Sequence, residues 1–310
     1  MTSLDATYYY DAFGMTIASQ VPLSELRRAR RERTPDISIV RGVVEHARAR
    51  LGAHAFMDFA NRGSIVMFWP TVGCFRIIGD HTVIVDPHPD VEERFLAFPL
   101  LGPVFAWMLS GKGLFLLHAS AIDIAGRSVV FMGDKLAGKS TTAAAFLRAG
   151  YPLITDDLVA ISFADRLAPT IMPAFAQVKL AEDAASAVPI AGATAQPLIH
   201  KDFPKRQHTL TSMASRPVAA DWFFVLRRGG ERVSLSHAGL PEAIQALNRF
   251  SYMTRFSNAD WTHAEDTAHF QNCVRLANVA RVGELNVPAG LERLPETVSF
   301  VVDLLRRKSL

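Results

Sequence analysis

Cysteine is scarce in this sequence, which has two cysteines, Cys74 and Cys273, among 310 residues. Neither belongs to a C-x-x-C pair, so the spacing excludes a typical zinc finger or disulfide framework and is typical of a chain kept in a reducing compartment. The first residues, MTSLDATYYYDAF, show no basic patch followed by an apolar core. We therefore expect no secretory signal and a cytoplasmic location.

A strong excess of one charge is also missing. The chain has 33 Lys and Arg residues against 30 Asp and Glu residues, which leaves a net charge of +3. Dedicated nucleic-acid binders usually carry far more positive charge, and we expect no nucleic-acid partner. Hydrophobic residues make up 49% of the chain, so it has ample apolar surface for a folded core, and intrinsic disorder is excluded.

Long hydrophobic runs are limited to one uncharged stretch, FLAFPLLGPVFAWMLS at residues 95–110. This stretch is shorter than the roughly 20 residues that a membrane-spanning helix needs, and it contains Pro99 and Pro103. We interpret it as a buried helix and expect no membrane partner.

The length predicts about two domains. Residues 1–92 contain short runs rich in β-branched and aromatic residues, broken by Gly, Pro and Asp, which predict an N-terminal β-rich domain. These runs are TYYYDAFGMTIAS, DISIV, AFMDFA, SIVMFW, CFRII and HTVIVD. In residues 93–310, candidate strands and helices are interspersed, which predicts a second domain of the α/β class.

The strongest motif is SVVFMGDKLAGKSTTAAAFLRAG, in which Gly133, Gly138, Lys139 and Ser140 match G-x-x-x-x-G-K-[ST]. An apolar run precedes this motif and an alanine-rich run follows it, as in a phosphate-binding loop, or Walker A motif, between a strand and a helix. We call residues 133–138 the glycine loop. Its backbone N–H groups would surround phosphate oxygens, Lys139 would reach the β and γ phosphates, and the Ser140 hydroxyl would bind Mg²⁺. The predicted nucleotide-binding residues are Gly133, Asp134, Lys135, Leu136, Ala137, Gly138, Lys139, Ser140 and Thr141.

An aspartate pair, Asp156 and Asp157, follows a short apolar run at residues 153–155. If that run is a strand beside the one before the glycine loop, its carboxyl end faces the same crevice. One aspartate can then hold a metal ion and the other can accept a proton from an attacking hydroxyl. The alternative is an ordinary Asp–Asp turn.

His118 is the third candidate. The runs LFLLHASAID and RSVVFMG are separated by a predicted turn at Ala125–Gly126, so paired positions of the hairpin sum to 251. His118 would then lie opposite Gly133. An imidazole there can orient an aspartate by a hydrogen bond, and the alternative is a structural histidine.

The segments HAS, GDKLAGKST and TDD, in this order and spacing, resemble the catalytic core of HPr kinase/phosphorylase. They resemble more closely its stand-alone relatives that act as kinases on lasso-peptide precursors. The likeness extends over most of the chain, through YYYDAFGMTIASQVPLSEL, FVLRRGG, NRFSYMTRF and RVGELNVPAGLERLPETVSFVVDLL. The resemblance implies an ATP-dependent serine kinase with an HPr kinase-like P-loop core built on a mixed sheet, covering residues 93–310. The HRD and DFG motifs of eukaryotic-type protein kinases are not found.

The resemblance also implies a catalytic group, which comprises His118, Lys139, Ser140, Asp156 and Asp157. We assign Asp157 as the base and Asp156 as the metal ligand with Ser140, although the residues alone allow the reverse order. ATP and Mg²⁺ are the implied cofactors, and a precursor peptide with a serine near its C-terminus is the implied partner. Basic residues that could bind the acceptor are Lys205, Arg206, Arg249 and Arg255, and their alternative role is a solvated surface.

Two departures from the family pattern bear on the substrate. The glycine loop carries Asp134, Lys135 and Leu136 where Gly and Ser are common, and PTIMPAFAQVKLAED follows the aspartate pair in place of a glycine-rich signature. The second departure favours a peptide kinase over an enzyme with phosphorylase activity on HPr. HPr or another small carrier protein is the alternative substrate, and a nucleotide-binding switch without phosphotransfer is the alternative from another class. HPr kinases are hexameric, but the sequence leaves homo-oligomer formation open.

Overall fold

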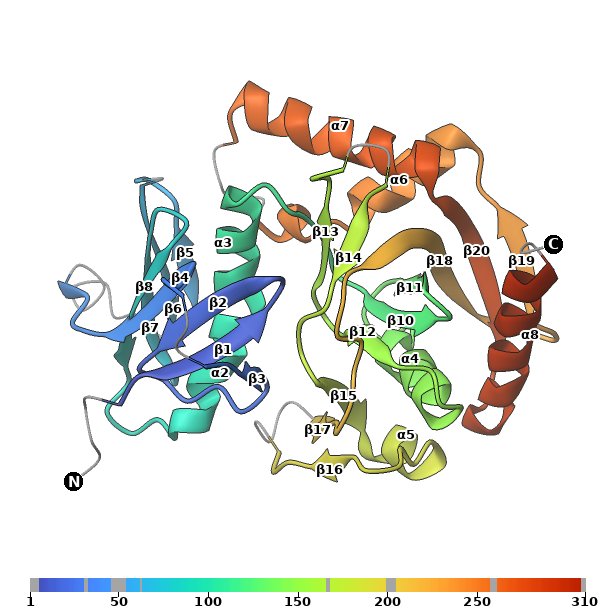
Figure 1. The fold of residues 1–310 in the computed structure, drawn as a ribbon, viewed down its shortest axis with the longest axis horizontal. Helices are drawn as coiled ribbons and strands as arrows, with labels where there is room; N and C mark the ends of the chain where they lie inside the picture. The colour runs from blue at the N-terminus through green and yellow to red at the C-terminus, as the bar shows by residue number, and fades with distance from the viewer. Residues whose placement is uncertain are drawn as a thin grey trace. The chain divides into compact units, whose positions relative to one another are not determined.

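The computed structural model describes residues 6–30, 33–45, 54–61, 63–165, 168–198, 205–256 and 261–307, and the chain divides into two compact units (Figure 1). The first unit comprises Met1–Leu114 and Arg255–Thr262, and the second comprises Phe115–Thr254 and His263–Leu310. The helical segment that follows residue 92 therefore groups with the N-terminal sheet, whereas the change in composition predicts that it belongs to a second domain of residues 93–310.

The first unit is built on an eight-stranded mixed sheet in the order β3-β1-β2-β4-β8-β7-β6-β5. All six runs predicted from the sequence form strands, because alternate side chains such as Ile65 and Met67 are buried on one face. The N-terminal β-rich region is thus confirmed. The strands are β1 (Tyr8–Ala12), β2 (Met15–Ser19), β3 (Arg27–Arg28), β4 (Ile37–Arg41), β5 (Phe56–Asp58), β6 (Ser64–Trp69), β7 (Gly73–Ile78) and β8 (Thr82–Pro87).

A kinked helical segment packs in the first unit and comprises η1 (Glu93–Leu96), α2 (Ala97–Pro99), η2 (Leu100–Val104) and α3 (Phe105–Gly111). The kink lies at Gly102, whose backbone is not helical, and at Pro103, which cannot donate a helical hydrogen bond. By length and composition alone the segment could cross a membrane, but 56% of its most apolar window is buried within the protein. The Phe105 ring meets the Phe13 ring edge-on, so the segment is a buried helix as expected.

An aromatic cluster joins two distant parts of the first unit. The Trp107 ring in α3 stacks on Trp261 at 5.3 Å and meets Phe256 edge-on at 5.4 Å between ring centroids. Phe59, from the segment after β5, lies 4.8 Å from the same indole. Phe256 and Trp261 therefore contribute to the aromatic cluster of this unit.

The second unit contains a nine-stranded mixed sheet in the order β12-β10-β11-β18-β14-β13-β9, with β20 paired to β18 and β19 paired to β20. Strand β18 runs parallel to both β11 and β20, while the hairpin of β10 and β11 is antiparallel. The mixed sheet agrees with the predicted α/β class. Its strands are β9 (Phe115–Leu117), β10 (Ser120–Ile124), β11 (Arg127–Met132), β12 (Leu153–Thr155), β13 (Val159–Ser162), β14 (Thr170–Met172), β18 (Val218–Gly230), β19 (Ser234–His237) and β20 (Arg281–Pro288).

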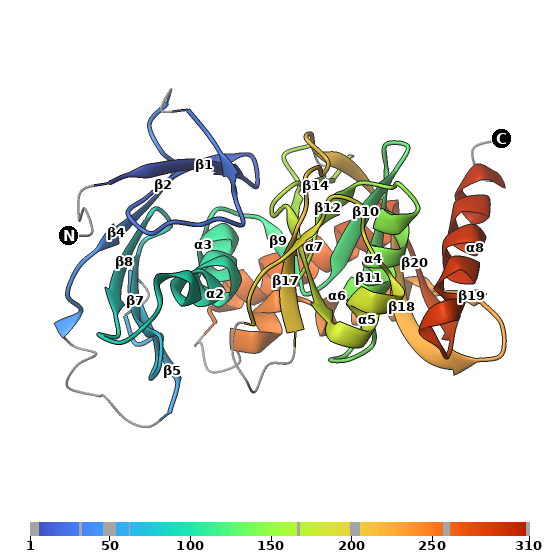
Figure 2. The same cartoon turned by 90° about the horizontal axis from the view of Figure 1, so that it is seen from below.

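Helices cover both faces of this sheet and make a three-layer unit (Figures 1 and 2). One face packs against α4 (Lys139–Arg148), α5 (Glu182–Ala187) and α8 (Leu294–Arg307), and the other packs against α6 (Leu240–Arg249) and α7 (His263–Val279). A separate three-stranded sheet has the order β15-β17-β16. The remaining elements are β15 (Gln177–Ala181), β16 (Thr194–Ala195), β17 (Lys205–Thr209), η3 (Tyr252–Phe256) and η4 (Leu291–Arg293).

The predicted hairpin register is confirmed from Ser120↔Phe131 to Ile124↔Arg127. The ladder ends before His118, however, because the chain bends between β9 and β10 and β9 pairs with β13 instead. The backbone N–H of His118 donates to the carbonyl of Phe250 at 2.9 Å. The expected position of His118 opposite Gly133 is therefore wrong.

Both cysteines are buried and free, as their spacing suggests. Burial, with the negative charge of Asp86 nearby, raises the pKa of Cys74 to about 12, and burial raises the pKa of Cys273 to about 12. The reactive thiolate is thus scarce at neutral pH, and neither cysteine is a candidate nucleophile.

Gly73, at the start of β7, gives a test of the first unit. Its φ is +139°, and an added Cβ would lie 2.5 Å from the Asp86 carbonyl oxygen and 2.9 Å from the Pro87 Cα. We expect Gly73→Ala to lower the free energy of unfolding by more than about 2 kcal/mol, because backbone atoms cannot yield.

Gly113→Ala is the matched control, because Gly113 has a φ of +82° but no atom within 4 Å of an added Cβ. It should lower the stability by only about 1 kcal/mol, the strain of a left-handed backbone. Denaturant unfolding followed by tryptophan fluorescence compares the variants. Equal losses would show that the close approach at Gly73 is not the determining factor.

Candidate functional site

The glycine loop lies between β11 and α4, in the strand–loop–helix context that the motif requires. Gly138 has a φ of +89° and directly precedes the first residue of α4, and Gly133 has a φ of +157°. A Cβ on Gly133 would lie 2.8 Å from the Ala137 Cβ, so a side chain there would collide within the loop. The glycines allow the tight turn that presents the helix N-terminus to an anion.

Lys139 folds back over the glycine loop. Its Nζ donates to the carbonyl oxygens of Gly133 at 2.9 Å and Asp134 at 3.2 Å, and the side chain is buried. The ammonium group thus bridges the first residues of the loop to the start of the helix. A cation in this position would lie against phosphate oxygens bound by the loop.

Asp156, at the end of β12, is held by donors from three other elements. Its Oδ1 accepts hydrogen bonds from Ser120 Oγ at 2.5 Å and Ser140 Oγ at 3.0 Å, and its Oδ2 accepts one from the Lys179 backbone N–H at 3.1 Å. Burial raises the pKa of Asp156, and the negative charge of Asp157 adds to the rise, while the Ser120 and Lys179 hydrogen bonds oppose it. The site therefore concentrates negative charge where a bound cation would offset the burial.

Asp157 is arranged differently from its neighbour. Its φ is +74°, an uncommon left-handed conformation for a non-glycine residue, which turns its side chain away from that of Asp156. Lys179 Nζ lies 2.8 Å from Oδ2, and His118 Nδ1 lies 3.4 Å from Oδ1 and 3.1 Å from the Asp157 carbonyl oxygen. The Asp157 side chain is 41% exposed, so an incoming group can reach it.

Ser140 and Asp156 fit a Mg²⁺ ion. Their oxygens converge, and hydroxyl and carboxylate oxygens are the hard ligands that Mg²⁺ prefers. No group of three or more His, Cys, Asp or Glu side chains suited to a metal lies in the part of the chain that the structure describes. The other ligands would be phosphate oxygens and water, as is usual for Mg²⁺ at nucleotide sites.

Three residues of the glycine loop that depart from the family pattern, Asp134, Lys135 and Leu136, are exposed. Arg249, at the end of α6, binds both carboxylate oxygens of Asp134 through its Nη2 at 2.9 Å. The predicted acceptor-binding Arg249 is thus paired with a residue of the loop itself. Thr141, in the first turn of α4, is half-buried.

The remaining basic candidates do not gather in one place. Lys205 and Arg206 are neighbours on β17 and therefore lie on opposite faces of the three-stranded sheet. Lys205 shares the face of Lys179, whereas Arg206 pairs with Leu180, which is buried in the core. Arg255 belongs to the first unit.

Three site residues were missed by the sequence analysis: Ser120, Lys179 and Arg228. Ser120 follows His118 by two positions, and its link to Asp156 follows from the pairing of β10 with β12. Arg228, in FVLRRGG, lies near the end of β18, which runs parallel to β11, and its Nε donates to the Ala137 carbonyl oxygen at 3.0 Å. Nothing local marks Lys179, because the three-stranded sheet that positions it forms between distant segments.

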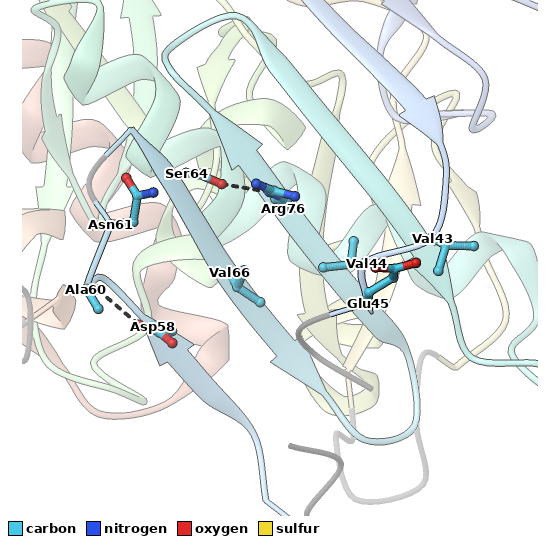
Figure 3. Close-up of a pocket in the computed structure, with 9 residues that line it drawn as sticks. All are labelled: Val43, Val44, Glu45, Asp58, Ala60, Asn61, Ser64, Val66 and Arg76. Atoms are coloured by element: carbon cyan, nitrogen blue, oxygen red, sulfur yellow. Dashed lines mark hydrogen bonds between the residues drawn. The ribbon is translucent and has the colours of Figure 1, made fainter. Parts of the chain in front are cut away.

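A separate pocket of about 530 Å³ lies in the first unit, among β5, β6, β7 and the segment after β4 (Figure 3). Arg76 Nε donates to Ser64 Oγ at 2.6 Å on its wall, and Glu45 and Asp58 also line it. This pocket contains none of the predicted site residues.

Comparisons with known proteins gave likenesses among solved structures. No family model and no curated protein matches the sequence. Among solved structures, the Hpr(Ser) kinase/phosphatase from Coxiella burnetii is similar, with a TM-score of 0.29 and 14% sequence identity. The alignment covers 62% of this chain and 98% of that one.

The Asp134–Arg249 pair gives a test of the glycine loop. Removing Arg249 leaves the Asp134 carboxylate un-neutralised beside the phosphates expected there. We predict that Arg249→Ala weakens Mg·ADP binding by about three- to fivefold at low salt, the range of an exposed ion pair, and that adding Asp134→Asn restores it. The dissociation constants can be measured by titration calorimetry.

High salt provides the control, because screening should shrink the difference between wild type and Arg249→Ala. Failure of Asp134→Asn to restore binding would show that Arg249 acts by some means other than neutralising Asp134.

Proposed function

We propose that this chain is an ATP-dependent serine kinase that phosphorylates a ribosomally made lasso-precursor peptide near its C-terminus. The observation that carries the proposal is that two adjacent aspartates beside the glycine loop differ in their burial and in their contacts. Asp156 is buried and accepts a hydrogen bond from Ser140, whereas the Asp157 side chain is 41% exposed. A nucleotide switch needs a metal ligand but no second carboxylate open to an acceptor.

The phosphate side of the reaction would use the glycine loop and Lys139. The backbone N–H groups of the loop and the start of α4 would bind phosphate oxygens, and the Lys139 ammonium would stabilise charge that develops on the transferring group. Mg²⁺ held by Ser140 and Asp156 would supply further positive charge to the β and γ phosphates. Because these groups are already fixed by the fold, little reorganisation is needed during transfer.

The acceptor side would use Asp157. Its carboxylate would accept the proton of the serine hydroxyl while the serine oxygen forms a bond to the γ-phosphorus. The bond from that phosphorus to the β–γ bridging oxygen breaks, and ADP leaves with the electron pair. Lys179 and His118, which contact the two carboxylate oxygens, would hold the base in one orientation.

A peptide acceptor is supported by the sequence resemblance and by one feature of the three-stranded sheet. Lys179 and Lys205 lie on the same face, because Lys179 pairs with Gln207, two positions from Lys205. Two strand positions correspond to about 7 Å. When the acceptor serine lies at Asp157, the Lys205 ammonium would be close enough to bind the C-terminal carboxylate of the same peptide. ATP and Mg²⁺ are abundant in the cytoplasm, where we place the reaction.

Asp157→Asn tests the base. We expect phosphotransfer to fall by about 100-fold or more, the usual contribution of a general base, while Mg·ATP binding stays within about twofold. Lys139→Ala should impair nucleotide binding and transfer together. Asp303→Asn, on the exposed face of α8, is the matched control and should leave both unchanged. Full transfer by Asp157→Asn would remove Asp157 as the base.

The acceptor can be identified by mass spectrometry of candidate precursor peptides after incubation with ATP and Mg²⁺. A gain of one phosphate on a serine, lost in Lys139→Ala, is the expected result. Phosphorylation of HPr and not of any peptide would favour the carrier-protein alternative. ATP hydrolysis with no labelled acceptor would favour the switch and contradict the proposal.

A further inference from the structure

Arg228 is brought to the glycine loop by the sheet. Strand β18 runs parallel to β11, with Met132 paired to Val225. The carboxyl ends of neighbouring parallel strands meet at one edge of a sheet. Arg228 lies three positions beyond Val225, so it emerges where β11 turns into the loop.

The contacts of Arg228 fit a ligand-binding role. Its Nε donates to the Ala137 carbonyl oxygen at 3.0 Å, which fixes the plane of the guanidinium group against the loop. The group lies directly over Gly138, where an added Cβ would be 1.9 Å from an Nη nitrogen. Gly138 directly precedes α4, so the charge lies beside the N-terminus of a ten-residue helix.

The neighbouring Arg227 makes different contacts from Arg228. Consecutive strand residues point to opposite faces, and Arg227 binds Glu284 of β20 through Nε at 3.1 Å and Nη2 at 2.7 Å. The charge of Arg227 is therefore neutralised by a carboxylate. In the described part of the chain, the hydrogen bond from Arg228 is to a neutral carbonyl of the loop, and its Nη groups make no ion pair.

We propose that Arg228 binds the terminal phosphoryl group of the nucleotide. This inference rests on the proposed use of ATP. The loop amides and Lys139 occupy the inner side of the site, where the β phosphate would bind. Arg228 is exposed and approaches from the neighbouring strand, so its Nη groups would meet the phosphate that extends beyond the loop. Two parallel N–H donors suit the oxygens of a phosphoryl group better than a single ammonium does.

The test compares the binding of ADP with that of a non-hydrolysable ATP analogue, each with Mg²⁺, by titration calorimetry on the full chain. We expect Arg228→Ala to weaken binding of the analogue by about 10- to 100-fold and that of ADP by less than about threefold. Arg228→Lys should recover part of the loss. Arg227→Ala is the matched control and should keep the wild-type ratio of the two affinities.

The outcomes separate this inference from the proposed function. Equal weakening of both nucleotides by Arg228→Ala would mean that Arg228 only holds the loop, and it would overturn the inference. So would unchanged binding of both. If the wild-type chain binds neither nucleotide, the proposed function fails as well. Thermal unfolding without nucleotide confirms that the variants are folded.

Discussion

The buried carboxylate of Asp156 is the group on which the arrangement of the candidate site depends. A buried charge is tolerated only when its oxygens find donors or a cation, and three elements meet this need. Ser120 comes from β10, Ser140 from α4 and the Lys179 amide from β15. The Asp156 carboxylate needs hydrogen-bond donors, and this need links α4, β10 and β15 at one point.

The same constraint explains why two consecutive aspartates differ. With Asp156 turned inward, the left-handed backbone of Asp157 turns the next side chain outward, towards Lys179 and His118. Lys179 contacts both aspartates: its backbone N–H donates a hydrogen bond to Asp156, and its Nζ donates one to Asp157. In the proposed function, metal binding and acceptor chemistry would be divided between these adjacent residues.

The sequence predicts the parts of this fold that depend on local patterns. Alternating apolar residues indicated the strands of the first unit, and the glycine loop was located by its motif and flanking runs. The contacts of His118, Lys179 and Arg228 depend on which strands pair with each other. Local sequence patterns do not predict this pairing. Lys205 and Arg206 formed one basic group in the sequence, but the alternation of β17 separates them. The boundary after residue 92 came from a change in composition, whereas the helical segment joins the sheet before it through packing.

The packing of Phe256 and Trp261 in the first unit affects the order in which this protein can mature. Trp107 packs against Phe256 and Trp261, so the N-terminal unit lacks part of its core until the ribosome has also made Phe115–Thr254 of the second unit. The N-terminal unit thus leaves the ribosome first but cannot complete its core at that point. A nascent or truncated chain that ends before residue 255 would present the uncovered indole and its apolar surroundings to chaperones, and the two units must mature together.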